Sequence, residues 1–384
     1  MPRTRRGRIS IKPNHVGLVL LNHVDSPFYL EIPLDTIKRN CLDPARYLRF
    51  VGWCVLGVEG KLSLEPAVDS DEGAEAEDAE VRDIEANTIY YYVRDENVLY
   101  LVDLDVIKMR ASVPSETTRT RKDFRAKLLE RDVICPYTGS GADYGSGHHI
   151  IPFSRGSEWL RLIVEGRPPY GERVDNFNDI NDIRNGVFVT NTLHTGLDSR
   201  KAVILKTPNP YLQPRDIPHP DPTDIVHNLS DEVSYPRHVR YTLQWLIPDK
   251  YLEVMIPNNR DAAFKKHTRK AKPSDLLLHY NYGTATVKWW GHNTEVLDQY
   301  EFPRPKAPVA APSTSKGDRT TRKHGAVRAT DGEPEEESGK RAWDEDDVVL
   351  FFWSNTRAAR ERRSKKMQED AQRMDQWRKG HSYF

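Results

Sequence analysis

Short apolar runs separated by polar stretches fill the first hundred residues. "VGLVLL" begins at Val16, and "FVGWCVLGV" covers 50–58. Such short runs are typical of strands, with one helix expected around "DTIKRNCL" between them. The Tyr- and Val-rich sequence "NTIYYYVRDENVLYLVDLDVIKMR" starts at Asn87, and its turn-prone "RDEN" indicates a hairpin. We therefore predict a small β-rich N-terminal unit over residues 1–110.

The pattern changes at Thr118, where apolar residues recur at helical spacing. Phe124, Leu128 and Leu129 would share one face of a helix that ends near Asp132. Further on, "YTLQWLIP", "YLEVMIP" and "LLLHYNYGTATVKWW" combine β-prone runs with a helix. These segments predict a second, larger domain over residues 118–300, of mixed α and β structure.

Three stretches lack the apolar residues that a packed element needs. Residues 69–85 carry nine acidic residues and one basic residue, so we predict a disordered loop over 66–87. Residues 303–341 are rich in Pro, Lys, Ser and Glu and predict a disordered linker. Residues 342–384 predict a charged C-terminal helix, which would either add affinity for nucleic-acid phosphates or remain a solvated helix.

Composition limits the cellular setting. The 384 residues have no net charge, and the three cysteines show no Cys-x-x-Cys spacing, which favours a reducing compartment. The basic N-terminus leads into no long apolar segment, and no run approaches a membrane span. We expect a soluble intracellular protein of the nucleus or cytoplasm, neither secreted nor bound to a membrane.

Candidate chemistry gathers in two segments. "GSGHHIIP" places His148 beside His149, and "NDIRNGVFVTNTLHTGLDSRK" follows from Asn181. The pair Asn185-Gly186 predicts a turn into the β-prone "VFVT". The next residues predict a short helix capped by Thr190 or Asn191. In that helix His194 and Asp198 are four residues apart and so share a face.

These residues resemble the HNH endonucleases, and in particular the stand-alone HNH proteins of fungi. The resemblance rests on "HHIIP" at 148–152, "NG" at 185–186 and "LHTGLD" at 193–198, with "RDVICPYTG", "LLHYNYG" and "WWG" around them. Its core covers 135–201. It implies an α+β fold with a ββα-metal core, in which a hairpin and a helix hold one divalent cation. It also implies an enzyme that hydrolyses the phosphodiester bonds of nucleic acid, with DNA as the first candidate substrate, before RNA.

Carried over by position, the resemblance makes His149 the general base and Asn185 the residue that steadies the motif loop. His194 and Asp198 become the metal ligands, with His148 where many members place a further ligand. One departure is the separation of 36 residues between His149 and Asn185, which requires a long insertion between the two strands. Nitrogen and carboxylate ligands suit Mg²⁺, Mn²⁺, Ni²⁺ or Zn²⁺ and do not choose among them.

Other interpretations of the same residues remain open. Neighbouring residues on a strand face opposite sides, so one histidine of the pair could point away unless a bulge turns both inward. His194 and Asp198 could be an ordinary surface pair on a helix. The chain could also keep the fold as a catalytically inactive module that binds nucleic acid or protein, or hold structural zinc through His148, His194 and Asp198.

Overall fold

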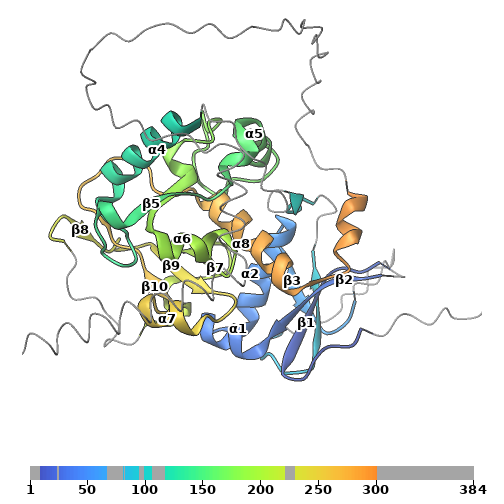
Figure 1. Cartoon of the computed structure of the whole chain (residues 1–384). Coiled ribbons are helices and arrows are strands. Elements are labelled where there is room, and N and C mark those ends of the chain that lie inside the picture. Colours follow the sequence, from blue (N-terminus) through green and yellow to red (C-terminus); the bar gives the residue numbers. More distant parts are fainter. Residues whose placement is uncertain are drawn as a thin grey trace, which may run out of the picture. The chain divides into compact units, whose positions relative to one another are not determined.

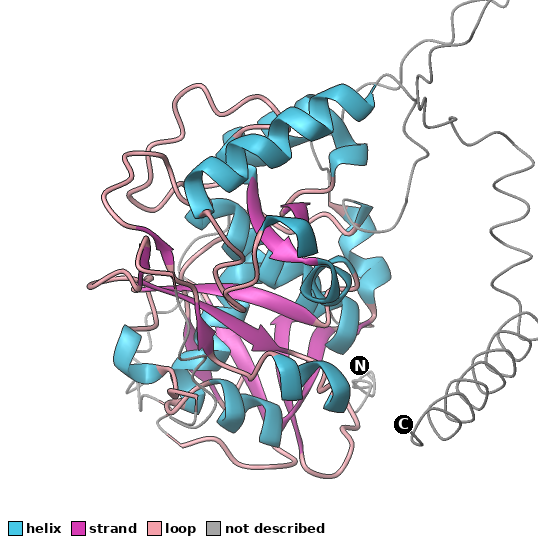
Figure 2. Ribbon diagram, turned by 60° about the vertical axis from the view of Figure 1, so that its left-hand side comes forward, coloured by secondary structure: helices cyan, strands magenta, loops and turns pink. Residues whose placement is uncertain are grey.

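The computed structural model describes residues 9–23, 26–66, 81, 83–94, 99–105, 117–220 and 230–300, with the backbone alone for 117–122 (Figure 1). Within these ranges helices accompany several separate sheets, so the fold is mixed α+β, as predicted. Several strands run through the middle of the described part, with helices on either side of them (Figure 2). The predicted linker 303–341, the predicted helix 342–384 and most of the predicted loop 66–87 lie outside the described residues.

The N-terminal unit is built on a five-stranded sheet of order β12-β2-β1-β4-β3. Its strands are β1 (His15–Leu21), β2 (Phe28–Pro33), β3 (Lys61–Ser63), β4 (Ile89–Val93) and β12 (Gly291–His292). The last residues of the predicted disordered loop are ordered against this sheet. Ile84 is buried, and the Glu85 amide donates to the Tyr90 hydroxyl at 3.0 Å. The predicted loop 66–87 therefore includes ordered residues at 83–87.

The apolar run at 50–58 is helical as far as Leu56, although short apolar runs of this kind are typical of strands. It belongs to α2 (Pro44–Leu56), which follows α1 (Leu34–Asn40). The Asp43 side chain caps α2 by accepting from the Arg46 amide, and Gly57 ends it with a left-handed φ of 72°. Most of α2 is buried, because it packs against both β1 and a later helix, α8 (Asp275–Trp290). Uniform apolarity here reflects burial on all sides rather than a strand.

The predicted hairpin after Asn87 is also wrong in its second half. Its first half is β4, which pairs with β1 and β3 instead. The described residues 99–105 form no strand, and they follow the end of α2. The Tyr100 amide donates to the Leu56 carbonyl at 2.8 Å, and the Val102 amide donates to the Val55 carbonyl at 3.0 Å. The carbonyls at the end of α2 have no partner within the helix, and they accept the hydrogen bonds that these amides would otherwise donate to a neighbouring strand.

The two regions predicted as separate domains share one sheet and one hydrophobic core. Helix α8 packs along α2 and β7 (Figure 1). It leads directly into β12, the edge strand of the N-terminal sheet. Buried residues from both regions belong to one continuous cluster, and residues Met1–Val309 form one compact unit. The region predicted as the second domain thus supplies the edge strand β12 of the N-terminal sheet.

Two smaller sheets complete the second region within the described residues. One has the order β10-β9-β7 and the other pairs β11 with β8. Their strands are β7 (Ala202–Thr207), β8 (Val233–Ser234), β9 (Arg240–Trp245), β10 (Arg260–Asp261) and β11 (Phe264–Lys265), and the helix α7 (Lys250–Met255) lies between β9 and β10 in the chain. Among the described helices, none has the length and apolarity to cross a bilayer. The three cysteines are free and buried.

The motif residues lie on two paired strands and a helix. β5 (Gly145–His149) runs antiparallel to β6 (Gly186–Thr190), which leads into α6 (Asn191–Asp198). Residues 150–185 separate the strands; they include the predicted insertion, residues 154–179, and contain α5 (Gly156–Glu165). The predicted helix from 118 to 132 is α4 (Thr117–Asp132), which contacts both strands. Short 3₁₀ turns are η1 (Ala142–Tyr144), η2 (Phe153–Arg155), η3 (Ile183–Asn185), η4 (Pro214–Asp216) and η6 (Thr294–Gln299).

Candidate metal centre

The two adjacent histidines face opposite sides of the strand pair. β5 and β6 pair without a bulge, from Gly145 opposite Thr190 to His149 opposite Gly186. Successive side chains of a regular strand alternate between faces. His148 accordingly contacts residues of α6, whereas the His149 ring stacks on Phe124 of α4 at a centroid distance of 3.9 Å. The bulge that would turn both imidazoles inward is absent from this strand pair.

Helix α6 begins and presents its polar residues as the sequence predicts. The Thr190 hydroxyl accepts from the Leu193 amide and so caps the helix. Leu193, Gly196 and Leu197 are buried and fix the rotation of the helix against its neighbours. His194 and Asp198 are one turn apart on another face, which is directed toward β5.

His148, His194 and Asp198 converge on one point. Nδ1 of His148 lies 3.3 Å from Oδ1 of Asp198, and Nε2 of His194 lies 3.4 Å from the same oxygen. One ligand atom from each residue falls within 4.8 Å of the others. Among the described residues, this is where His, Cys, Asp and Glu side chains gather in a group of three. The structure thus brings together three of the five predicted site residues.

The spacing and the donor atoms fit a divalent cation. Two ligands bound at about 2.1 Å in tetrahedral geometry lie about 3.4 Å apart, close to the two distances found here. Nδ1 of His148 is buried and has no hydrogen-bond partner, although it faces the Asp198 carboxylate. A buried nitrogen left in this way is costly unless it receives a proton donor or an ion. Two imidazole nitrogens and a carboxylate oxygen form a mixed ligand set for such an ion.

The hydroxyl of Ser146 orients the second histidine. It lies 2.7 Å from Nδ1 of His194, two residues before His148 on the same face of β5. When Nδ1 is protonated, its N–H donates a hydrogen bond to this hydroxyl, and the lone pair of Nε2 points toward Asp198. Outer hydrogen bonds of this kind set the tautomer and ring direction of histidine ligands. Ser146 therefore belongs to the site, although no motif position marks it.

The ionisation of the cluster matches what a cation requires. Burial lowers the pKa of the His148 imidazole to about 4, so the ring is neutral at neutral pH. Burial would raise the pKa of the Asp198 carboxyl, but its interactions with His148 and His194 outweigh burial and hold that pKa well below its usual range. A neutral imidazole beside an ionised carboxylate is the form in which both groups bind metal.

His149 lies outside this cluster, on the side of α4. Besides the stacking on Phe124, its ring contacts Phe153, and its Nε2 lies 3.1 Å from Oδ1 of Asn181. Because an amide oxygen only accepts, Nε2 is the donor in this contact. Asn181 comes from the segment between the two strands and was not singled out from the sequence. The predicted role of His149 as general base stays a prediction.

Asn185 is fully buried and binds the loop that follows β5. Its Oδ1 accepts from the Ile151 amide at 2.8 Å, and its Nδ2 donates to the carbonyls of Ile151 at 3.1 Å and Ile180 at 2.9 Å. The side chain thus links both ends of the insertion. The role that the resemblance implies for Asn185 in the motif stays a prediction.

A buried ion pair braces the strands from behind. Arg131 and Asp132 are both fully buried, and Nε of Arg131 lies 2.6 Å from Oδ1 of Asp132. Arg131 also donates to the carbonyls of Ile183 and Gly186, while Asp132 accepts from the Phe188 amide. Sequence reasoning passed over this Arg-Asp pair, because adjacent charges at a helix end look like solvated residues until the tertiary contacts are known.

No family model matches this chain, and comparison with curated proteins and with solved structures likewise gives no match.

Proposed function

We propose that this chain is a metal-dependent endonuclease of the HNH type, in which β5, β6 and α6 form a ββα-metal core. Its substrate would be nucleic acid, and DNA is the first candidate, before RNA. Its site would hold one divalent cation, Mg²⁺, Mn²⁺, Ni²⁺ or Zn²⁺. The proposal rests on the resemblance of the motif residues together with the geometry of the cluster.

The observation that carries the proposal is the convergence of His148 with His194 and Asp198. The motif spacing predicts a shared site, yet 36 residues separate His149 from Asn185. Strand pairing closes this gap, and the three ligand atoms meet within 4.8 Å. An unrelated surface pair on α6 would have no reason to face a buried imidazole from a strand. This supports the metal-site interpretation over that of a solvated helix pair.

Exposure of the cluster favours catalysis over a closed structural zinc site. The Asp198 side chain is 47% exposed and that of His194 is 28% exposed, whereas His148 is buried. An ion held here would have protein on one side and solvent on the other. Catalytic sites need such open coordination positions for water and substrate, whereas structural zinc sites are closed by four protein ligands.

Each site residue would have a separate part in the reaction. His148, His194 and Asp198 would hold the cation, which when bound supplies Lewis acidity to the phosphate and the leaving oxygen. The resemblance would make His149 the general base, since a neutral imidazole can accept a proton from water near neutral pH. Because His149 lies on the face of β5 opposite the cluster, this role would require its ring to leave Phe124 and reach the water beside the cation. Asn185 would act as a positioning residue by holding the loop after β5.

A cleavage assay with matched variants tests the proposal. Supercoiled plasmid and a single-stranded RNA are incubated with the full-length chain and each of the four cations, with and without chelator. We expect cation-dependent nicking that falls at least 100-fold in His194→Ala and Asp198→Ala. His149→Ala should lose about 100- to 10,000-fold in rate but keep its metal, as expected for loss of a general base. His238→Ala, at an exposed histidine, should retain full activity.

Metal binding read by calorimetry separates the alternatives. Stoichiometric metal without cleavage of DNA or RNA would favour a catalytically inactive module, and unfolding on chelation would favour a structural ion. Loss of cleavage in His194→Ala with unchanged metal affinity would contradict the assigned ligand set. Equal rates in wild type and His149→Ala would remove His149 from the mechanism while leaving the metal site intact.

A further inference from the structure

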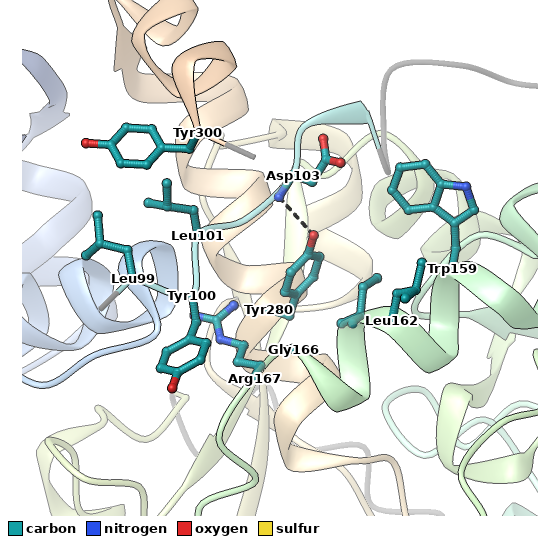
Figure 3. A pocket seen from close by; sticks show the side chains of 11 residues that line it. Leu99, Tyr100, Leu101, Asp103, Trp159, Leu162, Gly166, Arg167, Tyr280 and Tyr300 are labelled. Carbon is teal, nitrogen blue, oxygen red and sulfur yellow. Dashed lines mark hydrogen bonds between the residues drawn. The ribbon is translucent and has the colours of Figure 1, made fainter. Parts of the chain in front are cut away.

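A cavity of about 140 Å³ lies apart from the metal centre, between the segment 99–103 and the helices α5 and α8. Figure 3 shows Leu99 and Leu101 on one side, Trp159 and Leu162 on the other, and Tyr280 between them. The Tyr280 hydroxyl accepts from the Asp103 amide at 2.9 Å and so ties the segment to α8. Most of the lining is aliphatic or aromatic. Such a wall would pack against a flat or branched apolar group.

One cation is buried in this apolar wall. Arg167 is only 7% exposed and lies between the Tyr100 and Tyr280 side chains in Figure 3. Its Nη2 donates to the carbonyls of Trp53, at 3.0 Å, and Cys54. Its Nη1 is buried without a hydrogen-bond partner, and no carboxylate in the described part of the chain forms an ion pair with it.

Such a guanidinium is expensive to keep in the interior. Burial lowers its pKa, but an arginine in a protein keeps its proton, so the charge cannot be relieved by titration. The Tyr280 ring, with its centroid 5.3 Å from Cζ, offers partial compensation. A buried cation with an unused donor is satisfied best by an anion that also offers hydrogen-bond acceptors. The Asp103 carboxylate also lines the wall, but it accepts from the Asp105 amide at 2.8 Å. The wall therefore combines apolar packing with one cation that still has a donor to offer.

We propose that this cavity binds a small organic acid, with the carboxylate on Arg167 and an apolar ring or branched chain among Leu101, Trp159 and Leu162. A cavity of about 150 Å³ accommodates benzene, so the cavity of about 140 Å³ has the size of one aromatic ring. A carboxylate carries one charge and would neutralise Arg167, whereas a doubly charged phosphate would leave a second buried charge without a partner. The cavity lining includes no residue of the metal cluster, so this site is independent of the proposed nuclease function.

Calorimetric titration of the full-length chain with benzoate and with neutral benzamide tests the charge requirement. We expect saturable benzoate binding with an affinity at least 10-fold above that of benzamide. Phenyl phosphate serves as a third probe, and it should bind more weakly than benzoate. Equal affinity for benzoate and benzamide, or absence of saturable benzoate binding, would overturn the proposal. A clear preference for phenyl phosphate would overturn the choice of a carboxylate.

A variant that fills the cavity tests the location. Arg167 also borders a second cavity of about 60 Å³, whereas Leu162 lines the larger cavity and not the smaller one. Leu162→Trp should weaken benzoate binding at least 10-fold, and Leu64→Trp, at a leucine that is 59% exposed, should leave it unchanged. Benzoate binding that survives in a folded Leu162→Trp protein contradicts the location.

A second measurement needs no variant that might misfold. Benzoate should shift the indole N–H resonance of Trp159 in the wild-type protein, with the resonance assigned by its loss in Trp159→Phe. Half-saturation of this shift should match the calorimetric affinity. Binding without any shift of this resonance would show that benzoate occupies another place.

Discussion

The side-chain amide of Asn185 makes two hydrogen bonds to the backbone of Ile151, one to its amide at 2.8 Å and one from Nδ2 to its carbonyl at 3.1 Å. Thirty-four residues separate the partners in sequence. The amide thus closes the segment 150–185 at the point where it leaves β5. This contact fixes the backbone two residues beyond His149.

Replacing Asn185 by alanine should destabilise the protein by about 2–4 kcal/mol, because three hydrogen bonds are lost and a buried Ile151 amide is left unpaired. Urea denaturation monitored by circular dichroism measures the change in the free energy of unfolding. Asn178→Ala, at an exposed position in the same insertion, should change it by less than about 0.5 kcal/mol. Equal effects of the two variants would contradict the bracing role of Asn185.

Removing the Ser146 hydroxyl should weaken metal binding without unfolding the protein. Ser146→Ala takes away the partner of His194 Nδ1, so the ring is free to choose the wrong tautomer or direction. We expect a 10- to 100-fold loss in affinity for Mn²⁺ or Zn²⁺ by calorimetry, which is the usual effect of losing such a partner. Ser154→Ala, in the insertion, provides the control. An unchanged affinity would show that the hydroxyl does not orient the ligand.

Breaking the buried Arg131–Asp132 pair should be among the costliest substitutions in the described chain. Asp132→Ala leaves the Arg131 charge and the Phe188 amide without their partner, and removal of one member of a buried pair typically costs about 3–5 kcal/mol. Glu165→Ala, which breaks the exposed pair with Arg161, should cost at most about 1 kcal/mol. Chemical denaturation of both variants measures the contrast, and similar losses would refute it.

Acid should destabilise the fold in part through His279. Burial lowers the pKa of this imidazole from 6.5 to about 3, so the unfolded chain takes up the proton first. The stabilisation from the neutral ring is complete above pH 6.5 and decreases as pH falls toward 3, by up to about 1.4 kcal/mol for each pH unit. His279→Gln should flatten the decline between pH 6 and about 4, as measured by urea denaturation at each pH. His238→Gln, at an exposed histidine, should not flatten it.

Local patterns predict those features whose causes are local. The Thr190 cap, the extent of α4 and the shared face of His194 and Asp198 depend on residues within a few positions of one another. Because these patterns report only on nearby residues, they mislead where distant contacts decide the structure. The run at 50–58 resembles a strand in sequence because a wholly buried helix has no polar face to reveal its period. The second half of the hairpin after Asn87 lost its strand because the end of α2 offered other partners.

What the sequence by itself determined is therefore the mixed α+β class, the long insertion and the residue types gathered in the motif. Only the tertiary structure decided which histidine faces α6, because strand alternation sends His148 and His149 to opposite sides and packing against Phe124 chooses between them. It also supplied Ser146 and Asn181, whose roles come from contacts across 48 and 32 residues. Side chains that far apart in the chain meet through the pairing of β5 with β6 and the folding of the insertion, and neither contact leaves a periodic trace along the sequence.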